Sequence, residues 1–365
     1  MKIGIITFTI DNFGAQLQAF ALQHKLSLLG YNAEICDVSI EPASKEIRNN
    51  AKRKEWLRSL MSRDFLRTIR RMTDKALKRV DRRINKSGGG VGFKEFKLSL
   101  LKCSPVFSAD YIRKNPNLYD VYIVGSDQVW SYGMSSILDI YFLNFTKKQS
   151  ISYAASFGEG EIPSNLKVQY SEYLSHLDAI SIRERQGVGI ARNLTTHDIV
   201  KVVDPTFLLS KWEWEKLFDN TVLPDQPYVF VYDLIDSNYL TDYVIWLSKK
   251  DKLTVVSASG KTPQQFLALL AHAKHIVTTS FHGSALSINF GINFTTICRS
   301  SKSTNSRIVD ICEDFGLSDH VLMEGKPFMI PSVIQYDRYK ELLDAQIRDS
   351  LKFLVNNIKI KTKCQ

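Results

Sequence analysis

The stretch with the clearest chemical potential is HIVTTSFHGSALSINF, residues 275–290. An apolar, β-branched run leads into a corner at 280–283, and apolar residues at helical spacing follow, so the stretch predicts a buried parallel strand, a loop and a helix. The first N–H groups of a helix carry partial positive charge and bind anions. His282 is the side chain best suited to move a proton near neutral pH. The stretch therefore predicts an anion site with its own acid or base.

The anion site requires further groups, and the sequence offers several at nearby strand ends. Ser280 could cap the helix, and Gly283 lets a ligand approach the backbone closely. A cation at the carboxyl end of a strand could bind a phosphate or carboxylate, or could belong to an exposed ion pair. The cations in such positions are Arg183 and Arg185 after a strand over 179–182, Lys261 after a strand over 253–257, and Arg307 after a strand over 294–297.

Polar loops in the first half of the chain could hold a second ligand. Asn12 and Gly14 follow a strand over 2–9, and the Gly-Ser-Asp turn at 125–127 follows a strand over 120–124. Such residues could present polar groups to a ligand, or could only shape a turn and cap a helix. The sequence alone leaves both interpretations open. The same holds for His282, which a strand–helix corner could equally use as a hydrogen-bonded structural residue.

The elements that position these residues form two βα arrays. The first half has strands over 2–9, 31–38, 120–124, 150–155, 179–182 and 201–203, with helical patterns at 13–28 and 93–101, and a second series of strands and helices begins at residue 228. This order predicts an α/β fold with two Rossmann-like doubly wound domains facing a central cleft. The predicted domains are 1–222, with a basic helical insertion at about 45–86, and 228–330. A helix over 335–357 is expected to pack back across the domain boundary.

Composition restricts the class of protein. With 365 residues, 44% hydrophobic and 24% charged, the chain is that of a folded globular protein without an apolar run of the roughly 18 residues that span a bilayer. Five scattered cysteines and a first strand without a preceding signal pattern favour the cytoplasm. No His, Cys, Asp or Glu cluster has metal-ligand spacing, so no metal site is predicted.

The positive charge of the chain lies in one segment. Residues 45–86 hold 16 Lys and Arg against five Asp and Glu, whereas the rest of the chain is close to neutral. With an apolar stripe in the same segment, this pattern predicts basic helices that could contact an anionic membrane surface or a polyanion, or that simply pack on their parent domain. Nucleic acid is not an expected partner, because no recognised reading motif accompanies the charge.

Six stretches resemble the polysaccharide pyruvyl transferase family, in order and over nearly the whole chain. They are NFGAQLQAFAL (12–22), YDVYIVGSDQVW (119–130), ISYAASFG (151–158), ISIRERQGVGIARNL (180–194), VVDPTFLL (202–209) and TTSFHGSALSINFGINF (278–294). The resemblance implies a fold similar to that of the GT-B glycosyltransferases. It also implies transfer of the enolpyruvyl carbons of phosphoenolpyruvate onto two hydroxyls of a sugar, which gives a cyclic pyruvate ketal and phosphate.

The resemblance also implies partners and a division of labour between the two domains. Phosphoenolpyruvate would be the donor substrate, no cofactor would be needed, and capsule, exopolysaccharide or cell-wall glycans, often lipid-linked, would be the acceptors. His282 and Arg183 would be catalytic. The second domain, with Arg185 from the first, would bind the donor, and the first domain the acceptor. The residues expected to bind the donor are Ser280, Gly283, Ser284, Arg185, Lys261 and Arg307, and those expected to bind the acceptor are Asn12, Gly14, Ser126, Asp127 and Gln128.

Two other functions fit parts of the sequence. A nucleotide-sugar glycosyltransferase on the same fold would place a phosphate-bearing donor in much the same position. A non-catalytic polyanion- or membrane-binding protein would depend on residues 45–86 and not on His282. Neither explains why the motifs fall at strand exits in both halves. The sequence does not indicate the acceptor sugar or the oligomeric state.

Overall fold

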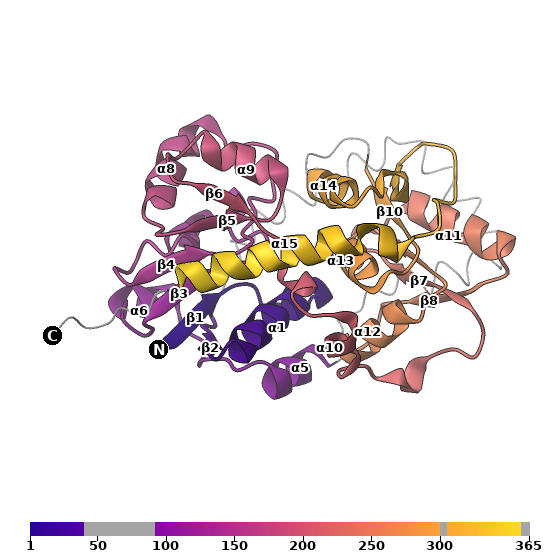
Figure 1. Ribbon diagram of the computed structural model, residues 1–365, viewed down its shortest axis with the longest axis horizontal. Helices are drawn as coiled ribbons and strands as arrows, with labels where there is room; N and C mark the ends of the chain where they lie inside the picture. The colour runs from indigo at the N-terminus through magenta and orange to yellow at the C-terminus, as the bar shows by residue number, and fades with distance from the viewer. Residues whose placement is uncertain (40–91, 300–304, 359–365) are drawn as a thin grey trace, which may run out of the picture.

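The computed structural model describes residues 1–39, 92–299 and 305–358. The basic segment 45–86, for which helices and membrane contact are predicted, lies outside the described residues. The described chain folds into two parallel β-sheets with helices packed around them, one sheet in each half of the molecule (Figure 1).

The first sheet is built from the N-terminal half of the chain and has the strand order β2-β1-β3-β4, all parallel. A second parallel pair, β5 and β6, continues it through single bridges from Ile151 to Ala179 and from Ala155 to Ile182. The strands are β1 (Lys2–Ile6), β2 (Asn32–Ile35), β3 (Val121–Val124), β4 (Gln149–Ser152), β5 (Ile180–Ile182) and β6 (Ile199–Lys201).

The second sheet has the order β11-β10-β9-β7-β8 and is also parallel throughout. Its central strands β7 and β9 are buried along their whole length, as expected for strands covered by helices on both faces. The strands are β7 (Tyr228–Tyr232), β8 (Thr254–Ser257), β9 (His275–Thr278), β10 (Phe294–Cys298) and β11 (Val321–Met323).

Both sheets wind in the same way. In each one the first strand lies between the second and the third in sequence, which is the flavodoxin type of doubly wound order. The order in which strands are added therefore reverses between β1 and β3 in the first sheet and between β7 and β9 in the second, although all strands stay parallel. In doubly wound sheets, ligands bind outside the carboxyl ends of the strands at this reversal. The predicted fold class is confirmed.

The helices connect the strands and cover the sheets. Several begin at sequence-encoded caps: Asn12 accepts from Ala15 N at the start of α1, and Thr262 and Gln265 form a capping box before α12. The α-helices are α1 (Phe13–Leu28), α5 (Phe93–Leu100), α6 (Ala109–Lys114), α7 (Leu138–Tyr141), α8 (Lys167–Ser175), α9 (Arg185–Arg192), α10 (Lys211–Glu215), α11 (Asn238–Lys250), α12 (Pro263–Ala271), α13 (Phe281–Phe290), α14 (Ser306–Asp314) and α15 (Tyr336–Asn357).

Helix α13 lies at the centre of the molecule, because all ten of its residues are buried. It contacts α1 from the first half of the chain, α12 and α14 from the second, and the short 3₁₀ helix Pro205–Phe207. One continuous apolar cluster accordingly contains residues from both sheets. Within it Phe13 of α1 stacks on Phe266 of α12, with ring centroids 4.3 Å apart. The two halves are thus joined by a shared core.

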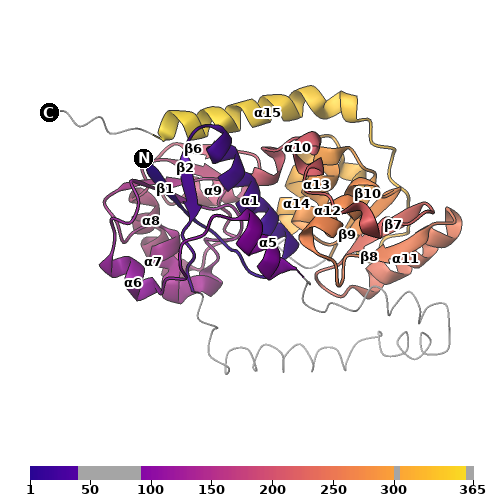
Figure 2. The same cartoon turned by 90° about the horizontal axis from the view of Figure 1, so that it is seen from below.

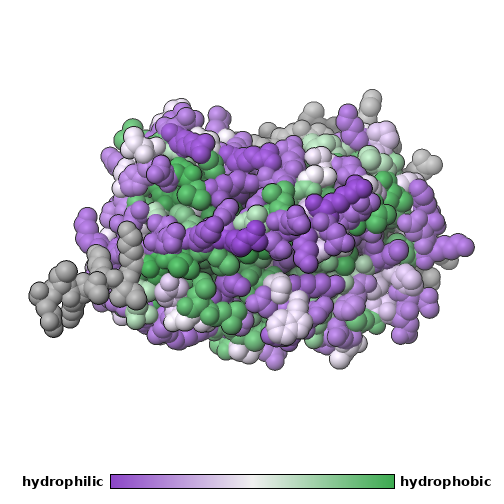
Figure 3. Space-filling model, in the orientation of Figure 1, coloured by the Kyte–Doolittle hydropathy of each residue, from purple (hydrophilic) through white to green (hydrophobic). Residues whose placement is uncertain are grey.

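Helix α15 runs across both halves of the molecule (Figures 1 and 2). Tyr339 donates from its hydroxyl to Ile288 O of α13, and Ser350 Oγ accepts from Val203 N of the first half. The exposed side of α15 forms a band of hydrophilic surface with apolar patches on either side (Figure 3). The helix therefore buries one face against both halves and presents the other to water.

Candidate functional site

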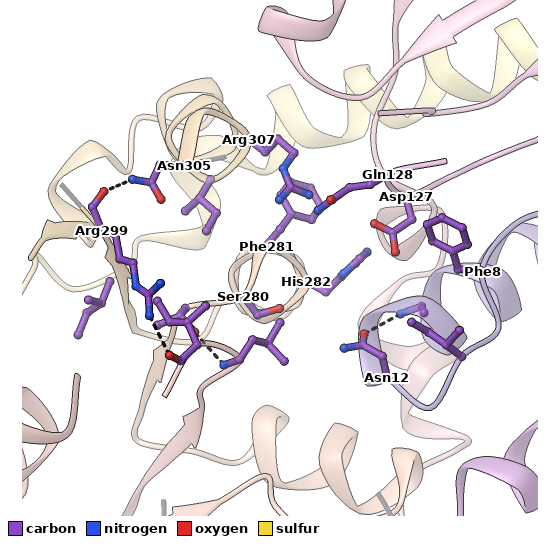
Figure 4. Close-up of a pocket in the computed structure, with 17 residues that line it drawn as sticks. Phe8, Asn12, Asp127, Gln128, Ser280, Phe281, His282, Arg299, Asn305 and Arg307 are labelled. Atoms are coloured by element: carbon purple, nitrogen blue, oxygen red, sulfur yellow. Dashed lines mark hydrogen bonds between the residues drawn. The ribbon is translucent and has the colours of Figure 1, made fainter. Parts of the chain in front are cut away.

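Loops from both strand reversals line one cavity of about 340 Å³ between the two sheets (Figure 4). The lining residues after the strands are Phe8, Ile10, Asn12 and Ala15 after β1, Asp127 and Gln128 after β3, Leu234 and Ile235 after β7, and 279–282 after β9. The carboxyl ends of β1 and β3 in the first sheet therefore lie across the cavity from those of β7 and β9 in the second. The remaining lining residues come from the end of β10 and from α14, and they are Ile297, Arg299, Asn305, Arg307 and Ile308.

The wall from the second sheet contains the N-terminus of α13. Ser280 is the N-cap, and its hydroxyl accepts from Gly283 N at 3.4 Å. The next two residues, Phe281 and His282, line the cavity, and the N–H groups at these first helical positions have no intrahelical acceptor. They are available to an anion together with the positive end of the helix dipole. The expectation of a helix N-terminus at this cavity is therefore met.

His282 contacts the first half of the molecule on two sides. Its side chain is buried, and Nε2 lies 3.5 Å from Asp204 Oδ2. Gly14, in the first turn of α1, packs against the other ring nitrogen: a Cβ added to Gly14 would lie only 2.1 Å from His282 Nδ1. The imidazole belongs to the second sheet, yet its position is set by residues of the first.

Asp204 is fully buried and accepts hydrogen bonds at both carboxylate oxygens. Oδ2 accepts from Arg183 Nη1 at 2.8 Å and from Ser126 Oγ at 3.1 Å, and Oδ1 accepts from the backbone N–H and hydroxyl of Thr206. Burial by itself would raise the pKa of this carboxyl. The neighbouring His282 and Arg183 outweigh burial and hold that pKa well below its usual range. Asp204 is consequently an anion at neutral pH.

Arg183 lies behind the cavity wall, with its side chain 2% exposed. It stacks on Phe281, 4.0 Å from the guanidinium carbon to the ring centroid, and it lies 3.9 Å from Asp127 and 3.6 Å from Glu184. Burial opposes its charge, but the carboxylates outweigh burial and raise its pKa. Burial also raises the pKa of Glu184, against the opposing effect of Arg183 and Arg307.

Two further arginines line the cavity itself. Arg307 reaches Gln128, whose amide oxygen accepts from Nη2 at 2.7 Å when it is turned toward the guanidinium. Burial, with repulsion from Arg183, lowers the pKa of Arg307. Arg299 donates from Nη2 to Ile235 O at 2.9 Å, on the wall formed by the second sheet. Both cations face the cavity that His282 lines, so an anionic ligand would be attracted to it.

The structure brings most of the predicted site residues together. Arg183 and Ser126 lie in the buried network around Asp204, and Gly14 packs against His282. Gly283 and Ser284 are inside α13, where Gly283 packs on Thr278 and the Ser284 hydroxyl donates to Ser280 O. The predicted residues that line the cavity are Asn12, Asp127, Gln128, Ser280, His282 and Arg307.

Two predicted donor-binding residues lie elsewhere. Arg185 begins α9 and pairs with Glu313 at 2.9 Å and with Asp314 of α14, while its side chain is 46% exposed. Lys261 follows β8 in the loop before α12, and it is not among the residues that line the cavity. The structure thus separates the two arginines of the Arg183–Glu184–Arg185 motif, which spacing alone could not.

Sequence reasoning missed three residues of this region: Asp204, Glu184 and Arg299. Asp204 stands at the exit of β6 within VVDPTFLL, so the rule that placed the other polar residues at strand ends would also have found it. Arg299 likewise follows β10. In the described part of the chain, no group of three or more His, Cys, Asp and Glu side chains is arranged to hold a metal ion.

Solved structures with similar folds are related only distantly. A UDP-GlcNAc 2-epimerase from Neisseria meningitidis bound to UDP-GlcNAc matches over 98% of this chain and 99% of that chain, at 10% identity and TM-score 0.48. The ADP-heptose heptosyltransferase II of E. coli matches over 96% of this chain and 100% of that chain, at 12% identity and TM-score 0.35. These values carry no argument about the reaction.

Sequence comparisons give a more specific result. A comparison with curated proteins finds no match. Within the described residues, no helix is both long and apolar enough to cross a membrane. The model of the polysaccharide pyruvyl transferase family matches residues 12–301, a range that takes in Asn12, Asp127, Asp204 and His282. The chain therefore belongs to the polysaccharide pyruvyl transferase family.

Proposed function

We propose that the cavity binds phosphoenolpyruvate and transfers its enolpyruvyl carbons onto two hydroxyls of a sugar, forming a pyruvate ketal and phosphate during surface polysaccharide biosynthesis. One observation carries the proposal: Arg307, Arg299 and the N-terminus of α13 converge on the cavity that His282 lines. A polyanionic donor and an acid–base group require this combination.

The donor fits the cations of the second-sheet wall. Phosphoenolpyruvate carries a carboxylate and a phosphate, and guanidinium groups bind both anions in bidentate geometry. Arg307 and Arg299 offer two such groups, and the N–H groups of Phe281 and His282 offer helix-terminal donors. The proposed donor site needs no metal and no cofactor.

The proposed chemistry uses His282 first as an acid and then as a base. The methylene carbon of the donor takes a proton from the imidazolium, and a sugar hydroxyl adds to the resulting cationic carbon while its proton returns to the imidazole. A second hydroxyl of the same sugar then displaces phosphate, which carries away the second hydroxyl proton. The sum is one donor and two hydroxyls converted into one ketal and one hydrogen phosphate.

The acceptor sugar would lie against the loops of the first sheet. Asn12 uses its side-chain oxygen to cap α1, so its amide group remains to donate to a sugar hydroxyl. Asp127 lines the same wall and can accept from one. The acceptor would be a glycan or a lipid-linked saccharide. We also propose action in the cytoplasm, with the basic segment 45–86 in peripheral contact with anionic membrane.

Phosphate release from phosphoenolpyruvate tests the proposal. Purified protein is incubated with the donor and a panel of galactosides, glucosides and aminosugars, and products are examined by mass spectrometry for the ketal. We expect acceptor-dependent release that falls by a factor of about 10² or more in His282→Ala. His197→Ala, at an exposed histidine of the first half, is the matched control and should release phosphate at the wild-type rate.

Three outcomes would count against the proposal or part of it. Equal release in wild type and His282→Ala would remove His282 from the chemistry. If no acceptor gives release and UDP-galactose, but not phosphoenolpyruvate, raises the melting temperature, the protein uses a nucleotide sugar. If deletion of 45–86 abolishes binding to anionic vesicles and neither donor binds, the working part is the basic segment.

A further inference from the structure

The two ring nitrogens of His282 lie in different surroundings. Nε2 has no accessible surface and no hydrogen-bond partner, and it faces Asp204 Oδ2 at 3.5 Å. His282 nevertheless lines the cavity, and Figure 4 shows its ring extending from α13 toward the loop that carries Asp127. Of the two ring nitrogens only Nε2 is an enclosed atom without a partner, so Nδ1, although Gly14 packs beside it, is the nitrogen that a ligand in the cavity can reach.

The charge on Asp204 dictates which nitrogen carries the proton. Asp204 Oδ2 accepts from Arg183 Nη1, and it shares the single hydroxyl proton of Ser126 with Ala154 O, so it still has lone-pair capacity for a further donor. An unprotonated Nε2 would place its lone pair against the lone pairs of that oxygen in a site without water access, which is strongly unfavourable. A protonated Nε2 can instead donate to it. A hydrogen bond requires the 3.5 Å separation to close by about 0.5 Å.

We propose that Asp204 is a positioning residue that keeps Nε2 of His282 protonated, so that Nδ1 is the atom that exchanges protons with the substrate. The inference rests on the proposed function for its catalytic meaning, but the location of the proton is a property of the protein without substrate. The carboxylate would orient the ring and stabilise the imidazolium form, as an aspartate does for a catalytic histidine in other enzymes.

The assignment has a consequence for the reaction. Imidazolium carries protons on both nitrogens, and transfer of the Nδ1 proton to the methylene carbon leaves the neutral ring with its proton on Nε2. Asp204 stabilises the imidazolium before that step, and the bond to Nε2 keeps the neutral ring in place afterwards. Nδ1 is then unprotonated and can accept the hydroxyl proton. The ring needs no rotation between its acid and base roles.

Nitrogen NMR of the wild-type protein gives the direct test. With ¹⁵N-labelled histidine, and His282→Asn to assign the signal among the seven histidines, neutral His282 should show a protonated Nε2 and an unprotonated Nδ1. A neutral ring protonated on Nδ1 would overturn the proposal. The measurement needs neither substrate nor a variant of Asp204, so it stands even if no acceptor is ever found to react.

The variant Asp204→Asn tests the role in catalysis. The amide keeps the shape but loses the charge, so the alkaline limb of the pH–rate profile, along which activity falls as the reacting acid loses its proton, should move to lower pH, and kcat should fall on the order of 10²-fold or more. The titratable groups that surround this pair and remain in the variant are Arg183, Glu184, Asp127, Tyr153, Tyr232 and Arg307.

Thr206→Val is the matched control, because Thr206 Oγ1 donates to Oδ1, the Asp204 oxygen that does not face His282. It should lower stability but leave the tautomer of His282 and the pH–rate profile unchanged. An equal displacement of the alkaline limb in both variants would show that general packing, and not the carboxylate, positions the ring. If the tautomer is the predicted one but no phosphate is released, the proposed function alone is rejected. If phosphate is released but the tautomer is the opposite one, this inference alone is rejected.

Discussion

Two arginines separated by one residue have opposite environments in this molecule. Arg183 is buried, stacks on Phe281 and is bonded to Asp204 within 2.8 Å, whereas Arg185 is 46% exposed on its side chain and pairs with Glu313 and Asp314 on α14. Both link the first half of the chain to the second. One does so inside the wall of the cavity, and the other does so in contact with water.

The difference shows that residue type and position in the sequence do not by themselves determine whether an arginine forms a buried or an exposed ion pair. Exposed ion pairs are screened by salt and contribute between about 0 and 1 kcal/mol to stability. Buried charges cost several kcal/mol to desolvate, so the network of Arg183 stabilises the fold little more than an apolar replacement of all its members would, and a role beyond stability explains it better. In this chain, that role is the support of Asp204 and His282.

Removal of Arg183 should have the largest effect. In Arg183→Met, three buried or partly buried carboxylates lose their cation, so the free energy of unfolding should fall by about 3–5 kcal/mol and phosphate release should be lost. Urea unfolding and the phosphate assay measure both. A loss below about 1 kcal/mol would mean that the buried network behaves like the exposed one, and the comparison would fail.

Two glycines, Gly14 near the buried arginine network and Gly189 near the exposed one, differ in how closely other atoms pack against them. A Cβ at Gly14 would collide with the His282 ring, so Gly14→Ala should displace the imidazole and lower kcat by about 10²-fold. Gly189, on the same helix as Arg185, has no atom within 4 Å of an added Cβ. Gly189→Ala should therefore keep full activity and raise stability by roughly 0.5–1 kcal/mol, because alanine favours helix. Similar activities in the two variants would contradict the position assigned to His282.

Arg185→Met should have the smallest effect. Lys201 remains to pair with Asp314, so the free energy of unfolding should change by less than about 1 kcal/mol at low salt. The change should disappear in 1 M NaCl, where the screening length is about 3 Å. Unfolding curves at both salt concentrations test this. A large loss that salt does not reduce would show that the α9–α14 contact behaves as a buried one.

Much of the fold could be predicted because its signals are local. The predicted strands over 120–124, 253–257 and 294–297 end within one residue of the observed β3, β8 and β10, since an apolar, β-branched run acts within a few positions. Helices α8 and α9 were not predicted. Two glycines interrupt the pattern of α9, and one of the elements that it packs against, α14, is distant in sequence.

The sequence could predict which residues lie at strand ends, but not those features of the site that depend on long-range contacts. Strand-exit rules located Asn12, Asp127 and His282, because the carboxyl ends of parallel strands meet at one edge. They could not separate Arg183 from Arg185, since an extended chain puts residues two apart on the same side. The structure separates them because α9 begins at Arg185 and turns the chain. Contact between Asp204 and His282 depends on the packing of one half of the chain on the other.

Helix α15 links these contacts to the end of the chain. Ser350 accepts from Val203, the residue before Asp204, and Tyr339 donates to Ile288 in the helix that carries His282. Helix α15 thus contacts both the residue before Asp204 and the helix that carries His282, so it bridges the two segments that bring the carboxylate to the imidazole. If one sheet turns against the other, α15 has to move with both. A substitution in α15 that loosens either contact would then alter the approach of Asp204 to His282 as well as the stability of the fold.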